Sequence, residues 1–374
     1  IIIKNFLMKN YLNFEEDIKK IELELDQLKD PYNQEGLSEV DTKKIQSLQD
    51  ELEKKLKNIY SNLNPLQTVL VARHEDRPKS KFFIDNLFSD FISLSGDRHY
   101  GEDKSVIAGF AKFSGASVLV IGQEKGESLD TRIERNFGMM KPEGYRKTIR
   151  LMKLADKFEI PIISFVDTPG AYPGVGAEER GQAEAIAKSI ECCIELSVPT
   201  ISIIIGEGGS GGAIALASSN KVLMLQNAIY SVISPEGCAT ILWKDPTKIL
   251  EAAEAMKLTA NALLNLEIID EIILEPSGGA HRDKNLILSN VRNSILENLN
   301  FLRNLEPEEI LSQRKNRFLS IGRKKGFISK TTDNEKLSMK ISIFDKFQSF
   351  IKLNKIFIFG TLFLFFVLLF FILI

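Results

Sequence analysis

The stretch IIIGEGGSGGAIAL, Ile203–Leu216, decides how the rest of the chain is interpreted. Five glycines fall between positions 206 and 212, after an apolar β-branched run and before an Ala/Ile/Leu run that predicts a helix. Glycine weakens strands and helices alike, so this concentration indicates that bare backbone is needed here. A dinucleotide fingerprint, a phosphate loop, an oxyanion hole and a tight turn are the structures that use such backbone.

Side chains around these glycines exclude two of the four structures. Residues 206–211 fit G-x-G-x-x-G, but the fingerprint also needs an acid about 20 residues further on, and residues 208–235 contain no Asp or Glu. A phosphate loop needs Lys and then Ser or Thr where this chain has Gly212 and Ala213. An oxyanion hole fits better, because Gly211 and Gly212 open a predicted helix whose N-terminus carries free amides and partial positive charge. A tight turn is the alternative, although it needs fewer glycines.

A second glycine-rich loop precedes the first by about 35 residues. It is VDTPGAYPGVGAEERGQAEAIA, Val166–Ala187, which again joins an apolar run to a predicted helix. Loops that follow parallel strands meet at the carboxyl edge of the sheet, so the two loops are expected to face one cleft. The predicted backbone donors are Gly174, Val175, Gly176, Gly211 and Gly212.

The order of predicted elements favours an α/β fold after an N-terminal helical segment. Two runs within residues 13–60 place apolar residues three and four apart, which predicts a coiled-coil-like helical hairpin. Later, β-branched runs ending in glycine-rich loops alternate with helical stretches at 142–158 and 177–196, as in largely parallel sheets. We predict a hairpin over 1–64, an α/β domain over 65–325, a polar and basic linker over 326–355 and a hydrophobic tail over 356–374.

The two ends of the chain allow more than one interpretation. The uncharged segment 356–374 is long enough to span a bilayer and follows several lysines, so it is either a membrane anchor or an extension of the reading frame. Residues 1–7 precede Met8 and either belong to the protein or are upstream read-through. The N-terminus is too short and too interrupted by Lys and Asn for a secretory signal.

Composition and cysteine usage limit the classes of function. Hydrophobic residues make up 44% and charged residues 26%, as in globular proteins, and a net charge of −2 gives no nucleic-acid signal. The three cysteines lack metal-ligand spacing, so we expect no metal on this chain and predict buried thiols in a reducing cytoplasm.

Several charged side chains near the loops have both a structural and a chemical interpretation. Glu207 and Glu236 could act as bases, but we expect structural roles for them. Glu178 is predicted to cap a helix that begins at Ala177, and Ser234 is predicted to be the N-cap of the helix that follows it.

Basic residues are expected to be solvated, and the histidines show no catalytic arrangement. We expect a solvated face for Arg146, Lys147 and Arg150, with a coenzyme A phosphate contact as the alternative, and a solvated exit from the domain for the cluster that includes Arg314. The three histidines, His74, His99 and His281, are far apart in sequence and predict no hydrolase triad.

Long collinear blocks now show a specific resemblance. The segments RNFGMMKPEGYRKTIRLM, FVDTPGAYPGVGAEERGQAEAIA, IIGEGGSGGAIAL and YSVISPEGCATILWKD, together with VARHEDRP, SGDRHYGEDKSVIAG and EPSGGAHRD, resemble the carboxyltransferase α subunits of bacterial-type acetyl-CoA carboxylase. The resemblance extends in order from about Asn13 to Gly322, where the family ends, so the tail departs from it.

The resemblance implies a crotonase-like (ClpP/crotonase) fold of repeated ββα units and transfer of a carboxyl group from carboxybiotin to acetyl-CoA, giving malonyl-CoA for fatty-acid synthesis. It implies that the biotin is attached to a biotin carboxyl carrier protein and not to this chain. It further implies a β subunit that carries a zinc ribbon, an α2β2 heterotetramer, and cooperation with biotin carboxylase. A bacterial cytoplasm is expected, with a plastid stroma as the alternative and membrane association only through residues 356–374.

The resemblance also assigns roles to the glycine loops. The backbone amides of Gly211 and Gly212, with those of residues 174–176, would stabilise the negative ureido oxygen of biotin. The residues expected on the carboxybiotin side are Gly208, Gly209, Tyr172 and Pro173. Alternatives are another crotonase-fold acyl-CoA carboxylase or decarboxylase chain, and a non-catalytic scaffold tethered to a membrane.

Overall fold

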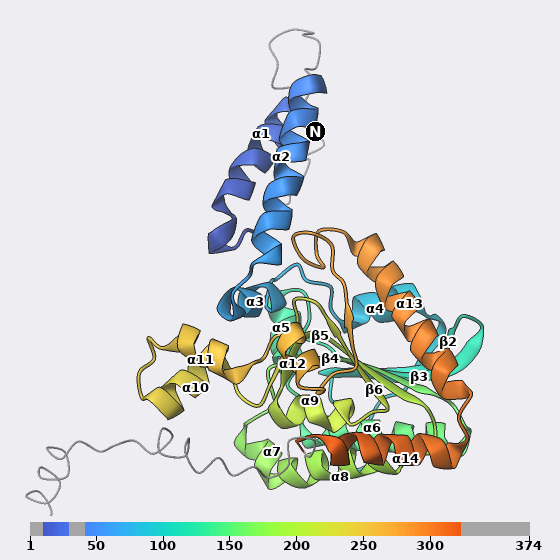
Figure 1. Cartoon of the computed structure of the whole chain (residues 1–374). Coiled ribbons are helices and arrows are strands. Elements are labelled where there is room, and N and C mark those ends of the chain that lie inside the picture. The colour runs from blue at the N-terminus through green and yellow to red at the C-terminus, as the bar shows by residue number, and fades with distance from the viewer. Residues whose placement is uncertain (1–9, 30–41, 323–374) are drawn as a thin grey trace, which may run out of the picture. The chain divides into compact units, whose positions relative to one another are not determined.

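The computed structural model describes residues 10–29 and 42–322 (Figure 1). The chain divides into a unit of residues Ile1–Ile321 and a second unit that begins at Gly322, and all described helices and strands belong to the first. The predicted linker and hydrophobic tail lie outside the described residues, and the predicted domain boundaries stay predictions. Within the described ranges, none of the helices combines the length and apolar character needed to cross a membrane.

A mixed sheet forms the centre of the first unit. Its order is β1-β2-β3-β4-β5-β6-β8, and β7 pairs with the end of β5. The neighbouring pairs β1–β2 and β2–β3 are antiparallel, and the pairs from β3 to β8 are parallel. The strands are β1 (Ser89–Ser93), β2 (Val106–Phe113), β3 (Ala116–Gln123), β4 (Ile162–Thr168), β5 (Thr200–Gly209), β6 (Lys221–Leu225), β7 (Ile229–Ser231) and β8 (Glu271–Ile273).

The central strands confirm the predicted parallel arrangement. Every residue of β4 and β5 is buried, as expected where helices cover both faces of a parallel sheet. The apolar run 221–233 forms two strands, β6 and β7, because a turn separates them. In that turn the Ala228 amide donates to Leu225 O over 3.0 Å, and the Asn227 amide donates to Glu275 over 2.9 Å.

Helices cover the two faces of the sheet (Figure 1). One layer contains α6, α8, α9 and α14, and α4 and α13 lie on the other face. The helices are α1 (Glu16–Lys29), α2 (Thr42–Ser61), α3 (Pro65–Ala72), α4 (Ser80–Leu87), α5 (Leu129–Glu134), α6 (Pro142–Lys157), α7 (Val175–Glu179), α8 (Gln182–Glu195), α9 (Ser210–Ala217), α10 (Pro235–Cys238), α11 (Ile249–Met256), α12 (Ala260–Asn265), α13 (Lys284–Arg303) and α14 (Pro307–Ser320), with short turns η1 (Asn13–Glu15), η2 (Asn136–Gly138) and η3 (Ala239–Trp243).

Local sequence explains where several of these helices begin. Ser234 caps α10 as predicted, since its hydroxyl accepts from the Gly237 amide over 3.1 Å. The helix predicted over 177–196 is instead broken between α7 and α8, because Gly181 adopts a left-handed φ of 81°. The prediction that Glu178 caps a helix starting at Ala177 was wrong: α7 begins at Val175 and has no side-chain cap.

The predicted helical hairpin is confirmed by α1 and α2, and buried polar contacts join it to the α/β body. Arg282 donates to Glu15 over 2.9 Å and to Glu22 over 2.7 Å. Tyr60 of α2 donates its hydroxyl to Glu15 over 2.9 Å. These contacts fix α1 against a loop near the C-terminal part of the body.

Two expectations about basic residues were wrong. Lys147 is buried rather than solvated, because its ammonium bonds to Glu102 and to the carbonyl oxygens of residues 103 and 106. Arg314 is fully buried and donates to carbonyl oxygens at the end of α8. One further contact was not predicted from the sequence: His74 and His281 stack with ring centroids 3.9 Å apart, although they are 207 positions apart.

The three cysteines are free and buried, as predicted. Burial raises the pKa of the Cys192 thiol to about 11 and that of the Cys193 thiol to about 12, so both are protonated at neutral pH. Their roles are therefore those of small packed side chains.

Candidate active site

The structure brings the two predicted glycine loops into contact at the carboxyl ends of β4 and β5. Thr168, the last residue of β4, is in register with Gly208 of β5. A Cβ atom built at Gly209 would lie 2.2 Å from Pro169 O, and one at Gly212 would lie 2.7 Å from the carbonyl carbon of Gly170. These glycines therefore permit the close approach of the two loops.

Close packing accounts for more of the glycines than the sequence suggested. A Cβ atom at Gly206 would lie 2.5 Å from the Asp167 carboxylate, and one at Gly208 would lie 2.9 Å from the Tyr230 ring. Only Gly211 has ordinary space, since its nearest neighbour would be Ile186 at 3.4 Å. The number of glycines alone is thus no argument for an oxyanion hole.

The amides of Gly211 and Gly212 support the oxyanion hole by their position. Helix α9 begins at Ser210, and its N-cap Gly209 offers no side chain to the first turn. No acceptor in the described residues pairs with the amide of Gly211 or Gly212. Such first-turn amides are free to bind an anion.

The earlier loop presents amides of the same kind. Gly174 is the N-cap of α7, and the Val175 and Gly176 amides lie in the first turn. Across the described ranges, none of the three amides donates a hydrogen bond to a protein acceptor. The Val175 side chain is 76% exposed, so this turn lies at the surface. The donors at 174–176 and Gly211 are therefore partly or fully exposed, whereas Gly212 is buried in the first turn of α9.

A mostly apolar groove adjoins Gly211. Its volume is about 610 Å³. The residues that line it are Ser210, Gly211, Ile214, Tyr230, Ser231, Val232, Ile233, Met256, Leu263 and Ile268. The groove thus combines an open first turn of α9 with apolar side chains from the elements that follow it.

The other predicted binding residues lie outside this lining. Gly208 and Gly209 are buried at the end of β5, beneath the turn. Tyr172 packs against Gly174, and the Lys141 ammonium lies 5.1 Å from the centre of its ring. Pro173 is exposed in the same loop.

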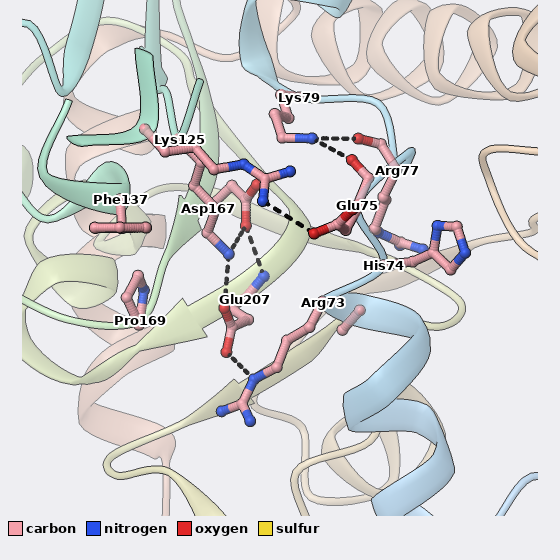
Figure 2. Close-up of a pocket in the computed structure, with 12 residues that line it drawn as sticks. Arg73, His74, Glu75, Arg77, Lys79, Lys125, Phe137, Asp167, Pro169 and Glu207 are labelled. Atoms are coloured by element: carbon pink, nitrogen blue, oxygen red, sulfur yellow. Dashed lines mark hydrogen bonds and ion pairs between the residues drawn. The ribbon is translucent and has the colours of Figure 1, made fainter. Parts of the chain in front are cut away.

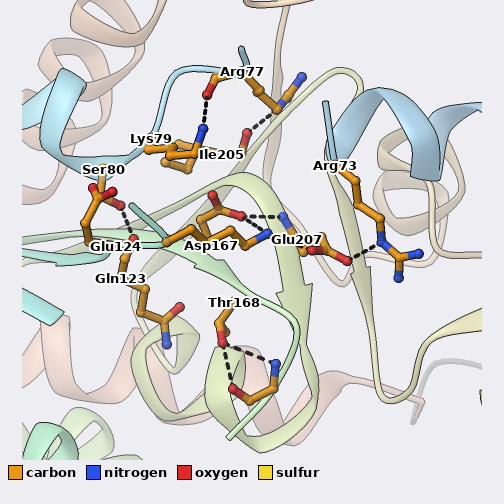
Figure 3. Close-up of polar contacts among 12 residues, drawn as sticks. Arg73, Arg77, Lys79, Ser80, Gln123, Glu124, Asp167, Thr168, Ile205 and Glu207 are labelled. Carbon is orange, nitrogen blue, oxygen red and sulfur yellow. Dashed lines mark hydrogen bonds and ion pairs between the residues drawn. The ribbon is translucent and has the colours of Figure 1, made fainter. Parts of the chain in front are cut away.

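A charged network that the sequence did not predict supports the end of β5 (Figures 2 and 3). The Lys125 ammonium lies 2.8 Å from Asp167 and 2.6 Å from Glu207. Arg73 donates to the other oxygen of Glu207 over 2.6 Å and to Glu236 over 2.8 Å. Asp167 also accepts the Glu207 amide over 2.9 Å. Glu207, near the end of β5, is therefore fixed by two ion pairs.

This network makes Glu207 and Glu236 unsuitable as general bases. Burial acts to raise the pKa of Glu207, but the charges and hydrogen bonds of Lys125 and Arg73 together outweigh burial, so the pKa lies below its ordinary value. Burial acts to raise the pKa of Glu236, but the hydrogen bond and charge of Arg73, together with local hydrogen bonds, outweigh it, so the pKa lies below its ordinary value. Both carboxylates are ionised and paired, which supports the structural roles expected for them.

Arg77 is a further residue whose role the sequence did not show. Its Nε donates to Ile205 O over 2.7 Å, and its two terminal nitrogens pair with the buried Glu275 over 3.0 and 2.5 Å. Arg73 and Arg77 both belong to the block VARHEDRP. That block was therefore the available signal, although spacing alone could not show that it holds β5.

A smaller, polar cavity of about 250 Å³ lies beside the network (Figure 2). Its lining consists of Ala72, Arg73, His74, Glu75, Arg77, Lys79, Lys125, Arg132, Phe137, Asp167, Pro169 and Glu207. Most of its charged groups pair with one another, and several of these pairs are the ones that hold the ends of β4 and β5 beneath the glycine loops.

Comparisons with known proteins agree with this arrangement. A family model described as "Acetyl co-enzyme A carboxylase carboxyltransferase-like" matches residues 11–322. The chain is 72% identical over 360 residues to the acetyl-coenzyme A carboxylase carboxyl transferase subunit alpha of Pelagibacter ubique, covering 95% of this chain and 97% of that protein. It is 49% identical to the subunit of the same name from Nitrobacter winogradskyi over 320 residues, covering 85% of this chain and 99% of that protein.

A solved structure shows the same fold at low sequence identity. The transcarboxylase 12S core, solved with methylmalonyl-coenzyme A and methylmalonic acid bound, superimposes with a TM-score of 0.51 and 19% identity. The match covers 62% of this chain and 44% of that chain.

Proposed function

The chain belongs to the family of carboxyltransferase α subunits of acetyl-CoA carboxylase and has its crotonase-like fold, and we propose that its two glycine loops bind the carboxyl donor in a site completed by a partner chain. Its function is that of the α subunit, which takes part in the transfer of a carboxyl group to acetyl-CoA. The match over 97% of a relative favours this function over another crotonase-fold enzyme or a non-catalytic scaffold.

The proposed donor is carboxybiotin attached to a separate carrier protein. The groove of about 610 Å³ beside Gly211 has room for a bicyclic ring, and its apolar lining suits the aliphatic chain through which biotin is attached. Gly211 offers bare backbone at one end of this groove, with no atom closer than 3.4 Å to the position of a Cβ. Carboxybiotin supplies the carboxyl group for transfer.

The role proposed for the chain's own residues is to stabilise negative charge. The amides of Gly211 and Gly212 point out of the first turn of α9 and have no acceptor in the described part of the protein. They donate to the oxygen on which charge develops when the carboxyl group leaves, aided by the partial positive charge of the helix end. The amides of residues 174–176 provide the second set of donors. One such donor lowers the activation barrier by about 3 to 4 kcal/mol.

The partner proposed for the remainder of the site is a carboxyltransferase β subunit. Val175, in the first turn of α7, is 76% exposed, and Val232, which lines the groove, is 82% exposed. Ile241 is 63% exposed. Exposed apolar side chains at a site are typical of a surface that another chain covers. We propose that two α and two β chains assemble, that the zinc ribbon belongs to β, and that acetyl-CoA binds mainly to β.

The proposed enzyme works with biotin carboxylase, which loads the carrier protein. The named relatives come from bacteria, which supports a bacterial rather than a plastid origin. Within the described ranges, no group of three or more His, Cys, Asp or Glu residues is arranged to hold a metal ion. The donors proposed for this chain are backbone amides, so their action needs no metal on this chain.

Gly211→Val tests the oxyanion role in the co-expressed α/β complex. The assay is malonyl-CoA-dependent carboxylation of a free biotin derivative. The new side chain covers the first-turn amides, and because only Ile186 lies near, at 3.4 Å, the fold is retained. Loss of one donor predicts a fall in kcat of about 10²- to 10³-fold. Gly212→Val is a poorer test than its position suggests, because its side chain would collide with the Gly170 backbone.

The control is Gly101→Val, where no atom lies within 4 Å of the added Cβ and where the position is far from the loops in sequence. It is expected to leave both assembly and kcat unchanged. A well-assembled Gly211→Val complex with full activity would refute the oxyanion role. A wild-type complex without carboxyltransferase activity would refute the proposed function.

A further inference from the structure

Two buried glutamines hold the two glycine loops from below. Gln123, the last residue of β3, is fully buried, and its Nε2 donates to Gly212 O over 2.7 Å (Figure 3 shows Gln123). Gln182, the first residue of α8, is 3% exposed, and its Nε2 donates to Tyr172 O over 3.0 Å. Each loop thus has one side-chain amide that fixes a backbone carbonyl.

The same residue, Met140, contacts both glutamines. Gln123 Nε2 lies 3.3 Å from Met140 Sδ, and Gln182 Nε2 donates to Met140 O over 2.9 Å. Met140 O also accepts the Tyr172 amide over 3.0 Å. Met140 is fully buried, so a continuous chain of polar contacts runs from the α9 turn to the earlier loop.

Strained backbone precedes Met140. Asn136, Phe137 and Gly138 have consecutive left-handed φ values of 47°, 55° and 81°, and two of them are not glycine. A Cβ atom at Gly138 would lie 2.7 Å from Asp167 O, so this turn fits closely beneath the end of β4. Such strain persists only where surrounding structure requires it, which supports a defined position for Met140.

Both glutamines also retain an unsatisfied acceptor. Gln123 Oε1 and Gln182 Oε1 are buried without a hydrogen-bond partner among the described residues. A buried acceptor without a partner destabilises a fold, whereas an apolar side chain of the same length would avoid the penalty. The unpaired Oε1 atoms therefore offset part of the stability that the Nε2 hydrogen bonds of these amides contribute.

We propose that Gln123, Met140 and Gln182 form a brace that sets the two glycine loops at the separation and orientation that their amides need. These are positioning residues, since they act through the backbone of Gly212 and Tyr172. The proposal rests on the proposed function of the loops as anion donors. Small displacements of such donors lower kcat because their alignment with the reacting atoms is lost.

Gln123→Met and Gln182→Met test the brace in the co-expressed α/β complex. Each removes the donor, keeps the side-chain length and removes the unsatisfied acceptor. Each is expected to lower kcat about tenfold with KM for both substrates within about twofold, and to leave the denaturation midpoint close to wild type. If the three residues act as one unit, kcat of the double variant is expected to lie little below that of the less active single variant. Independent effects would instead lower kcat about 100-fold below wild type.

Ser202→Ala is the matched control. Its hydroxyl donates over 2.7 Å to Leu216 O, at the opposite end of α9 from Gly212. Losing this bond is expected to lower stability while kcat stays at the wild-type value. A purely structural Gln123 would behave in the same way, so the two variants separate positioning from packing.

Hydrogen exchange gives a second readout that does not depend on activity. Gln123 is joined to the earlier loop through Met140 and through the contact of Gly212 with Gly170, so Gln123→Met is expected to speed exchange of the Tyr172 amide several-fold. Ser202→Ala is expected to leave that amide unchanged. Wild-type kcat in both glutamine variants, multiplicative losses in the double variant, or unaltered Tyr172 exchange would overturn the brace. An inactive wild-type complex would instead overturn the proposed function, and the exchange comparison would still test the brace.

Discussion

Removal of the Lys125 ammonium should destabilise the protein through the two carboxylates that it leaves behind. Lys125 lies 2.8 Å from Asp167 and 2.6 Å from Glu207, and the three side chains are 15%, 7% and 10% exposed. Lys125→Met keeps most of the side-chain volume but removes the charge. Asp167 then has no cation in the contacts described for it, while Glu207 keeps Arg73.

The expected magnitude follows from the burial of this cluster. Breaking a buried ion pair by removing one partner costs about 3 to 5 kcal/mol, because the remaining charge is uncompensated. For a body of roughly 300 residues, this corresponds to a melting temperature lower by about 5 to 8 °C. The end of β5 carries the predicted donors, so kcat is expected to fall as well.

The destabilisation should depend on pH with a defined sign. In the wild type the pKa of Glu207 is lowered, so its ionised form stabilises the fold above the ordinary carboxylate range, and this contribution is lost as the pH falls through the folded pKa. Without Lys125, burial is opposed only by Arg73 and the pKa of Glu207 rises. The deficit of the variant relative to wild type is therefore expected to shrink as the pH is lowered from about 7 to about 5.

Denaturant unfolding at several pH values measures this deficit. Lys112→Met is the matched control, because Lys112 lies 2.9 Å from Asp90 but both side chains are more than half exposed. An exposed pair of this kind contributes at most about 1 kcal/mol, so the control should remain near wild type. Equal effects of the two substitutions, or a Lys125→Met deficit that grows on acidification, would refute the reasoning.

Two further substitutions test other buried groups. Arg314→Met leaves several carbonyl oxygens without their donor and should lower the unfolding free energy by about 3 kcal/mol in denaturant titrations, whereas the exposed neighbour Lys315→Met should stay within about 0.5 kcal/mol; similar values for both would contradict the hub role of Arg314. Burial beside His74 lowers the pKa of His281 from 6.5 to about 3, so the unfolded state binds more protons below pH 6.5 and the wild type should lose up to about 1.4 kcal/mol per pH unit there. His281→Gln should remove this part of the slope and the exposed His99→Gln should not; an unchanged slope in His281→Gln would show that other groups cause it.

Much of the fold could be predicted from local sequence. Alternating β-branched runs and helical periodicity located the parallel strands, and Pro142 marked the start of α6. The glycine loops were found because their composition is unusual and because parallel topology places such loops at one edge. The contact between Gly209 and Pro169 confirms that the two loops meet.

The polar support of the loops could not be predicted in the same way. Arg73 and Glu207 are 134 positions apart, and their pairing follows from the packing of α3 against β5 rather than from any spacing. Arg314 belongs to a basic run that resembles a solvated surface, and only the packing of α14 against α8 turns one member inward. Composition cannot show which member of such a run is buried.

The contacts of Arg282 with the N-terminal hairpin have a consequence for synthesis of the protein. Arg282 and Glu15 are separated by 267 positions, so α1 leaves the ribosome long before its anchor exists. At ordinary bacterial rates of about 5 to 20 residues per second, the delay is roughly 13 to 53 seconds. During that interval the hairpin is stabilised only by contacts between its own helices. Glu15 and Glu22 have no Arg282 to pair with until most of the chain has been synthesised.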